Sequence, residues 1–431
     1  MRFHVVLIPG FAGFDALGQL EYYGGITRLF QKHGAGNLVL HYFDNFPTAA
    51  VVTRATRLGS YLAKRIARGE FSIRDEVTLV GHSTGGLDIR WLLWDLHHRQ
   101  QQPIVVDGGV KVEPAEILRI VRRVVFLSVP HWGTNIANWM QSYGVARRAL
   151  VEELRAAVAG SQLLLLDRLG TSVTGGAACL TGAELFRAVQ DALSEANEHN
   201  GRPGPVRTAE AQEAASELAL YLRHMASDFR AIDDLTSGPQ RTGKPLSPAH
   251  FSVRDRKKEL RLGQRIKFRS YVTLGRRPFR FDPGVPAPLW EFAKPWTYPE
   301  ASKDAALSAG TDMVYRACYR ACAGGPFERP ALGGKVTKRL RGSAQHPIEI
   351  WDNDGIVNTL SMFWPTGANV LVPGDHMDIV GQYKLVRAES GGGRKYCAYD
   401  LLKSESGFDE DTLDKVWREV FGFCRGHVRL D

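Results

Sequence analysis

Residues 77–87 read V-T-L-V-G-H-S-T-G-G-L, and this stretch decides the fold. Its first four residues predict a short buried strand, and the apolar run after residue 87 predicts a helix. The G-x-S-x-G pattern stands between them, where Gly81 and Gly85 lack the Cβ atoms that would hold strand and helix apart. A Gly/Ser turn can match this pattern by chance, but a preceding strand and a following helix predict a nucleophile elbow that projects Ser83.

The elbow also predicts where negative charge can be stabilised. Thr84 N–H lies at the expected helix start, where backbone donors have no partner and the helix dipole favours an anion. Residues 5–8 predict a buried strand, and a glycine-rich loop at 9–14 follows it. A loop after an early strand is the usual place of the second oxyanion donor, and Phe11 N–H is the candidate. The alternative is an ordinary strand-to-helix turn.

Short apolar strands alternate with helical segments in the first third of the chain. This alternation predicts an α/β protein with the α/β-hydrolase fold, in which helices cover both faces of a mainly parallel sheet. The expected elements are strands at 5–8, 38–42, 77–80 and 124–129 and a helix at 51–68.

Three regions are expected. Residues 1–134 form the N-terminal half of the core, and residues 241–431 form its C-terminal half, which includes a loop rich in Pro and aromatic residues at 279–299. Residues 135–240 carry helical patterns and no clear strand, which predicts a cap or lid over Ser83. Such lids exclude water and shape the acyl site. A helical subdomain without a gating role is the alternative.

A late carboxylate and a late histidine complete the expected machinery. Residues 348–351 predict a strand that Asp354 follows in a tight turn, and residues 370–372 predict a strand that His376 follows. With Ser83 first, this is the chain order of an α/β hydrolase. His376 Nε2 would take the proton of Ser83, and Asp354 would hold the Nδ1–H group. The rival candidates are Asp352 for the acid and His131, His346 and His427 for the base.

Composition and charge limit the classes of partner. The 431 residues are 44% hydrophobic and 23% charged, which is typical of a globular protein. The net charge is +9, and eleven basic residues fall within 254–280 against Asp255 and Glu259. This region could contact an anionic membrane surface, but a solvated loop and an edge strand are favoured, with 266–274 as a half-exposed strand. No nucleic-acid motif is present, so no nucleic acid partner is expected.

The cysteines and the apolar runs indicate in which compartment the protein is expected. Five cysteines, an odd and sparse set, argue against a disulfide framework, and nothing resembles a zinc ligand set. The N-terminal apolar run is too short for a secretory signal. The sequence has no stretch of about 18 apolar residues, so no membrane span is expected. The sequence as written predicts a cytoplasmic location, and secretion stays open if a signal was trimmed.

Five segments together resemble the bacterial triacylglycerol lipases of the Pseudomonas and Burkholderia type. The resemblance implies an α/β-hydrolase fold, carboxylic-ester hydrolysis and a helical lid. It implies Ser83 as nucleophile, Asp354 as acid and His376 as base. One departure is Pro9-Gly10 in the oxyanion loop, where such lipases have His-Gly, and another is that those lipases are secreted. The matching segments are 18–26, 81–87, 130–133, 353–357 and 376–382, which cover the core and skip most of 135–340.

The resemblance also implies a calcium ion near the loop of the catalytic histidine. Asp378 and Gln382 match two of its protein ligands by position. Calcium prefers six to eight oxygen ligands, so a second carboxylate is expected, with Asp304 and Asp312 as guesses. A carboxylate at a helix start is the alternative for Asp378. The ester chemistry itself requires no cofactor.

These observations predict a serine carboxylic-ester hydrolase, an esterase or lipase that forms an acyl-enzyme on Ser83. Its expected partner is an acyl ester or lipid. Acyl transfer, phospholipid cleavage and polyester cleavage on the same triad are alternatives, because the choice of acceptor depends on access to the pocket. A non-catalytic protein that binds lipid or a partner through 254–280 is a second class of hypothesis.

Overall fold

The computed structural model describes most of residues 1–142, 228–278 and 315–426, together with residue 224. The expected cap at 135–240 lies largely outside the described residues, and the loop at 279–299 lies wholly outside them. Among the described helices, none combines the length and the apolar character needed to cross a membrane. Also outside the description are Asp304, Asp312, His346 and His427.

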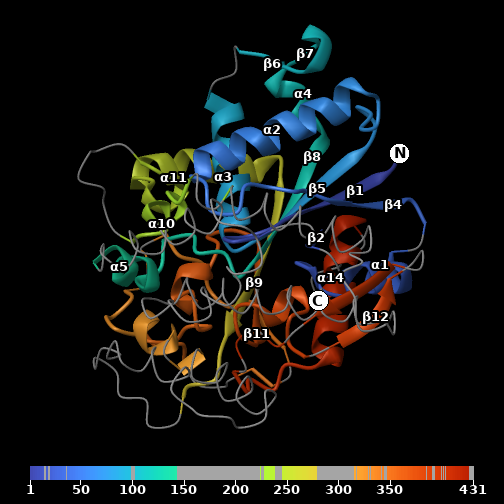
Figure 1. Ribbon diagram of the computed structural model, residues 1–431. Coiled ribbons are helices and arrows are strands. Elements are labelled where there is room, and N and C mark those ends of the chain that lie inside the picture. Colours follow the sequence, from blue (N-terminus) through green and yellow to red (C-terminus); the bar gives the residue numbers. More distant parts are fainter. Residues whose placement is uncertain are drawn as a thin grey trace, which may run out of the picture.

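The centre of the molecule is a seven-stranded sheet in the spatial order β10-β11-β9-β8-β5-β1-β4 (Figure 1). Every neighbouring pair in it is parallel, as the alternating pattern predicted. The carboxyl ends of all seven strands therefore meet at one edge of the sheet. The strands are β1 (Phe3–Ile8), β4 (Leu38–Tyr42), β5 (Glu76–His82), β8 (Val121–Leu127), β9 (Lys267–Leu274), β10 (Lys338–Arg339) and β11 (Ala368–Pro373).

Helices cover both faces of the sheet (Figure 1). On one face, α2 (Val51–Ala67), α3 (Thr84–His98) and α4 (Pro114–Ile120) lie together, and α3 packs against β5. On the other face, α1 (Ile26–His33) packs against α14 (Glu410–Cys424), which contacts β1. Because both faces are covered, β1 and β8 are apolar almost throughout and buried.

Smaller elements surround this core. A second sheet has the order β12-β13-β3-β2, and β6 pairs with β7 in a two-stranded sheet. Their bounds are β2 (Ala16–Leu17), β3 (Leu20–Glu21), β6 (Ile104–Val105), β7 (Lys111–Val112), β12 (Val386–Ser390) and β13 (Arg394–Ala398). The remaining helices are α5 (Asn135–Ser142), α10 (Ala231–Asp234), α11 (Val253–Leu260), η1 (Asp107–Gly109), η2 (Pro248–His250), η3 (Arg261–Gln264), η5 (Thr359–Met362) and η6 (Asp378–Val380).

The prediction of a half-exposed edge strand at 266–274 is wrong. β9 lies between β8 and β11, and every one of its residues after Lys267 is buried. Its alternating polar residues find partners inside the protein instead of water. The guanidinium of Arg269 lies 4.9 Å from the ring centroid of Phe423, and Ser270 Oγ donates to the carbonyl of Met362 at 3.1 Å.

The strand expected at 348–351 is also absent. Glu349 N–H donates to Asp352 Oδ2 at 2.9 Å, and Asp352 N–H donates to the Glu349 carbonyl at 3.1 Å. These two bonds close a tight turn, so the backbone there cannot extend to pair with a strand. The apolar residues of this segment therefore do not mark a buried strand, and Ile350 is exposed.

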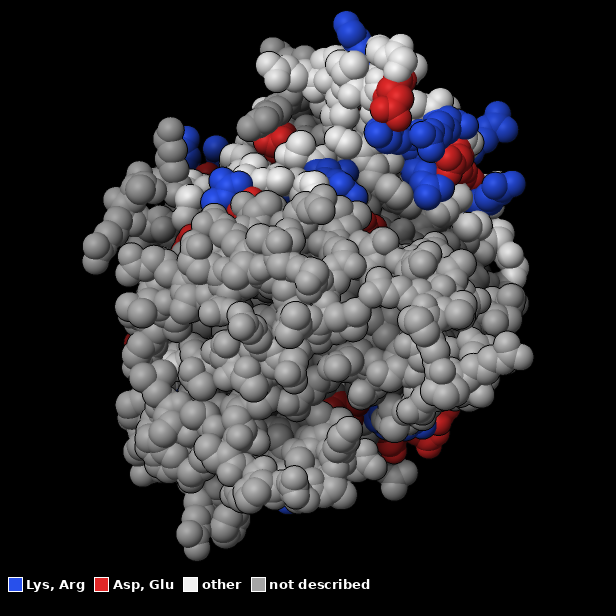
Figure 2. Space-filling view, viewed as in Figure 1, with Lys and Arg blue, Asp and Glu red and all other residues white. Residues whose placement is uncertain are grey.

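The basic region at 254–280 is divided between the surface and the interior. The Arg256 side chain is buried, with its guanidinium 3.4 Å from the ring centroid of Trp132, while Arg254 and Lys257 stay exposed. On the face shown in Figure 2, Lys and Arg gather around the N-terminus and one end of α2. The last turn of α2 carries Lys64 and Arg65.

Candidate active site

The predicted elbow joins β5 to α3, with Ser83 between them. Ser83 has φ 52°, a left-handed conformation that a residue with a side chain rarely adopts. Its side chain is nearly buried, with 5% exposed. The backbone of Gly85 lies so close to β1 that a Cβ there would be 2.5 Å from the Ile8 carbonyl oxygen. The turn is therefore a strained elbow of the predicted kind, held between two strand ends.

The loop after β1 lies against the elbow. A Cβ on Gly10 would be 2.6 Å from Ser83 Cβ, so only glycine allows this approach. Phe11 follows directly, and no hydrogen-bond partner of its backbone N–H is found among the described residues, whereas Ala12 N–H donates to Pro47. Thr84 is the first residue of α3, where a backbone N–H has no partner within the helix. The loop that carries Phe11 and the start of α3 thus both lie beside Ser83.

A buried arginine, Arg54, donates hydrogen bonds to the backbone of this loop. Arg54 Nη2 donates to the carbonyls of Pro9 at 2.8 Å and Gly10 at 3.2 Å, and Arg54 Nε lies 2.9 Å from Asp88 Oδ2. Burial raises the pKa of Asp88 to about 6, although Arg54 acts in the opposite direction. Charge-assisted bonds of this kind are stronger and shorter than neutral ones. Arg54 therefore orients the peptide groups from which Phe11 N–H projects.

Asp354 and His376 come together at the same edge of the sheet. His376 Nδ1 lies 2.8 Å from Asp354 Oδ2, and the backbone N–H of His376 donates to the Asp354 carbonyl at 3.0 Å. Both side chains are buried. Because a carboxylate only accepts, Nδ1 carries the proton of a neutral ring and Nε2 presents a lone pair. That is the state a general base requires.

Three further donors saturate the Asp354 carboxylate. Oδ1 accepts from the backbone N–H groups of Ile356 at 3.1 Å and Val357 at 2.7 Å. Oδ2 accepts from Thr273 Oγ1 at 2.6 Å, in addition to His376. A buried carboxylate with four donors is held in one orientation and pays little for its desolvation.

His82 connects the loop of His376 to the elbow. His82 Nε2 lies 2.8 Å from the His376 carbonyl oxygen, and the two ring centroids are 4.7 Å apart. Since His82 directly precedes Ser83, the base loop and the elbow are tied together at adjacent residues.

Two of the rival residues, Asp352 and His131, have other partners. Asp352 Oδ1 accepts from Arg277 Nη2 at 2.8 Å and Arg277 Nε at 3.0 Å, so this carboxylate is engaged by a guanidinium. His131 is fully buried, with its ring 4.6 Å from that of Phe126 and 4.9 Å from that of Trp364. Burial lowers the pKa of His131 well below its usual value.

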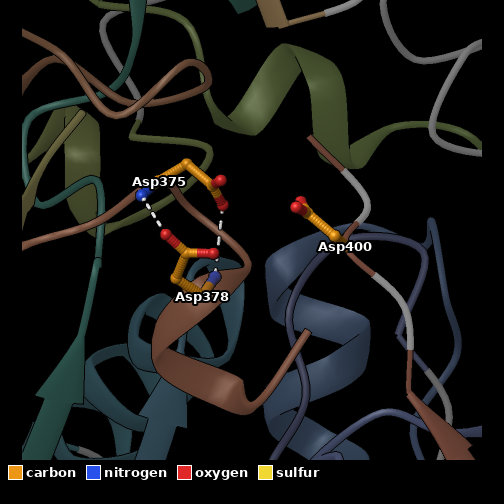
Figure 3. Close-up of side chains that lie close together, drawn as sticks. All are labelled: Asp375, Asp378 and Asp400. Atoms are coloured by element: carbon orange, nitrogen blue, oxygen red, sulfur yellow. Dashed lines mark hydrogen bonds between the residues drawn. The ribbon is translucent and has the colours of Figure 1, made fainter. Parts of the chain in front are cut away.

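One of the two metal ligands expected from the resemblance, Asp378, lies in a group of three carboxylates. Asp378 joins Asp375 and Asp400, and one carboxylate oxygen from each lies within 4.8 Å of the others. Figure 3 shows Asp400 pointing from a neighbouring segment toward the hydrogen-bonded Asp375 and Asp378. The second expected ligand, Gln382, donates from its Nε2 to the Glu21 carbonyl at 2.6 Å.

This group of carboxylates suits a hard cation. Burial raises the pKa of Asp375 to about 7, and burial together with the neighbouring Asp375 raises the pKa of Asp378 well above its usual value. Calcium takes oxygen ligands at about 2.3–2.6 Å, so ligand atoms on opposite sides lie at most about 5 Å apart. The oxygen-only donor set of Asp375, Asp378 and Asp400 fits that geometry.

Several residues of the site were not anticipated. Arg54 could have been found, because it is a charged residue on the face of α2 that buries Val51 and Leu58. Asp375 could also have been found, since it directly precedes His376. Tyr22 lies in the matching segment 18–26, but nothing there pointed to a role for it. Thr273 and Asp400 gave no local signal, because only the tertiary structure brings them to the site.

The parallel sheet, the strained elbow after β5 and the Asp–His pair after later strands define an α/β-hydrolase fold. No protein-family model matches the chain, and no curated protein matches it significantly.

Several solved structures align with the chain at low identity. EstA from Clostridium botulinum is 15% identical over 96% of this chain and 87% of that chain, with a TM-score of 0.43. Staphylococcus hyicus lipase is 15% identical over 98% and 95%, with a TM-score of 0.45. Lipase 1 from Pelosinus fermentans is 17% identical over 100% of both chains, with a TM-score of 0.40. The assignment of the fold rests on the sheet and the elbow, not on these alignments.

Proposed function

We propose that the protein is a serine hydrolase of carboxylic esters. The observation that supports this most strongly is the saturated Asp354 carboxylate paired with His376 Nδ1, in a loop bonded to the residue before Ser83. The finer assignment to lipases of the Pseudomonas and Burkholderia type remains a prediction from the resemblance.

The proposed reaction begins when His376 Nε2 takes the proton of Ser83 Oγ as the oxygen attacks the ester carbonyl carbon. Phe11 N–H and Thr84 N–H stabilise the resulting oxyanion, a term that is usually worth about 3–4 kcal/mol per donor. His376 then returns the proton to the leaving alkoxide, which leaves an acyl group on Ser83. Water, activated by His376 in the same way, releases the acid. Asp354 keeps the imidazole oriented and stabilises its positive charge.

Active-site labelling tests the proposal. Wild-type protein treated with a fluorophosphonate should gain one adduct, located on Ser83 by peptide mass spectrometry, and should hydrolyse p-nitrophenyl butyrate or palmitate. Ser83→Ala should form no adduct and lose most turnover with its fold retained. The ratio of the two esters separates esterase from lipase. Folded wild-type protein that forms no adduct and cleaves neither ester would overturn the proposal.

We also propose that Asp375, Asp378 and Asp400 hold a calcium ion. When bound, the ion would neutralise the three carboxylates and fix the loop between β11 and η6. The chain itself already closes this loop, because Asp375 N–H donates to Asp378 Oδ2 at 2.8 Å. His376 lies between these two residues in the sequence. The ester chemistry takes no step through the metal.

Calcium binding is tested by unfolding. Calcium at 100 times its Kd should raise the free energy of unfolding by about 2.7 kcal/mol relative to protein in EDTA. Asp400→Asn should abolish that gain, whereas Asp411→Asn, an exposed carboxylate on α14, should keep it. Equal stability of the wild type with and without calcium would contradict the proposal.

We also propose contact with an anionic membrane through the exposed basic residues of 254–280, such as Arg254, Lys257 and Arg276. Vesicles rich in phosphatidylserine should bind Ser83→Ala protein at low salt and release it at high salt. Binding that salt does not change would contradict it.

A further inference from the structure

Two buried side chains, Tyr22 and His82, connect three parts of the active site. Gly10 N–H donates to Tyr22 Oη at 2.9 Å, and Tyr22 Oη lies 2.6 Å from His82 Nδ1. On the other side of the ring, His82 Nε2 lies 2.8 Å from the carbonyl oxygen of His376. The chain of bonds runs from the loop after β1 to the loop after β11, and it passes through the residue beside Ser83.

The direction of each hydrogen bond follows from the groups involved. A carbonyl oxygen only accepts, so His82 Nε2 carries a proton. Burial, aided by His376, lowers the pKa of His82 well below its usual value, so the ring is neutral and Nδ1 accepts. Burial raises the pKa of Tyr22, which keeps the phenol protonated as the donor to Nδ1. Gly10 N–H then donates to the phenol oxygen.

This arrangement acts on both halves of the proposed reaction. Gly10 precedes Phe11, so the bond to Tyr22 orients the peptides that present the Phe11 N–H donor. The bond from His82 fixes the backbone of His376, and therefore the position from which its imidazole reaches Ser83. A displacement of about 1 Å in such a geometry can cost about 100-fold in rate.

We propose that Tyr22 and His82 are positioning residues: His82, held in its Nε2–H tautomer, sets the oxyanion loop and the base loop against the nucleophile. This inference rests on the proposed ester hydrolysis. Neither side chain touches substrate, and neither exchanges a proton during turnover.

Two substitutions of His82 test its hydrogen bonds to Tyr22 and to His376 separately. His82→Gln can place an amide N–H near the position of Nε2 and keep the bond to His376. His82→Asn can place a polar atom only near Nδ1, so it keeps a partner for Tyr22 and loses the bond to His376. We expect His82→Asn to lower kcat by about 100-fold with KM unchanged, and His82→Gln to recover most of that loss. Equal kcat in both variants and the wild type would overturn the proposal.

A tyrosine pair supplies a matched control. Tyr22→Phe removes one oxygen atom, which is both the acceptor for Gly10 N–H and the donor to His82, and should lower kcat by about 10-fold or more. Tyr23→Phe also removes one buried hydroxyl, which donates to the Ile8 carbonyl at 2.7 Å. It should lower the free energy of unfolding by about 1 kcal/mol and leave kcat unchanged. Similar kcat values for the two variants would contradict a positioning role.

The tautomer can be measured without turnover. In ¹⁵N-histidine-labelled Ser83→Ala protein near neutral pH, His82 should show a protonated Nε2 and an unprotonated Nδ1. The opposite tautomer, or an imidazolium, would overturn the inference whether or not the protein cleaves esters. If the wild type forms no fluorophosphonate adduct, the proposed function fails and the tautomer result still stands. If the wild type is active and Tyr22→Phe and His82→Asn equal it, the inference alone fails.

Discussion

At the scale of single residues, the acid of the proposed triad depends on a threonine. Thr273 Oγ1 lies 2.6 Å from Asp354 Oδ2 and 2.8 Å from Ser128 Oγ. One hydroxyl proton serves one acceptor at a time, and the acceptor-only carboxylate is the stronger one. If the Asp354 carboxylate loses this donor, one of its lone pairs is left without a partner in a buried site, and its orientation toward His376 becomes less fixed.

Replacing Thr273 by Val should therefore impair the proposed catalysis while the side-chain volume stays nearly constant. A hydrogen bond to a charged group contributes about 1.5–3 kcal/mol, so we expect kcat for p-nitrophenyl butyrate to fall by about 10-fold or more. Thr273→Ser keeps the hydroxyl and should stay close to wild type. If Val and Ser variants share the same kcat, the hydroxyl has no positioning role.

At the scale of elements, the strand, elbow and helix around Ser83 act as one unit. α3 can approach the end of β1 only because residue 85 has no side chain: a Cβ there would lie 2.5 Å from the Ile8 carbonyl and 2.7 Å from the Pro9 carbonyl. Both neighbours are backbone atoms of a central strand and its loop, so neither can move aside without moving the oxyanion loop.

Gly85→Ala should consequently destabilise the fold and disturb the site. We expect the free energy of unfolding in urea to fall by about 1–3 kcal/mol, with a loss of ester hydrolysis beyond the loss of folded protein. Gly325→Ala is the control, because a Cβ there would meet nothing within 4 Å. An unchanged unfolding midpoint for Gly85→Ala would show that β1 and α3 can separate freely.

At the scale of the whole molecule, buried carboxylates control how stability depends on pH. Asp234 Oδ2 accepts from Val51 N–H at the start of α2. Burial raises the pKa of Asp234 to about 7, against about 3.9 in an unfolded chain. Between these values the folded state binds more protons than the unfolded state, so stability falls as the pH rises from about 4 to about 7.

Asp234→Asn should flatten that dependence, because asparagine can still accept from Val51 N–H and does not ionise. One unit of pKa corresponds to about 1.4 kcal/mol, so a shift of about three units means that the variant should gain on the order of 4 kcal/mol relative to wild type across this window. Urea unfolding at several pH values measures the slope, and Asp411→Asn serves as an exposed control. A wild-type slope retained in Asp234→Asn would contradict the assignment.

The sequence by itself determined the features that depend on near neighbours in the chain. The strand, elbow and helix around Ser83 follow from apolar runs and two glycines within eleven residues, so the pattern predicted them and the parallel sheet. The order of Ser83, Asp354 and His376 is also a property of the chain, and it singled out the pair that the structure joins by a 2.8 Å hydrogen bond.

The tertiary structure alone decided which distant residues meet. Whether 266–274 is an edge strand depends on which strands flank it, and its alternating pattern could not reveal that β11 would pair beside it. Thr273 and Asp400 reach the site from segments outside its motifs, and the bond between Tyr22 and His82 joins two motifs that lie 60 residues apart, because packing brings these residues together. Local patterns carry the backbone conformation, whereas partners for buried polar groups are chosen by the fold as a whole.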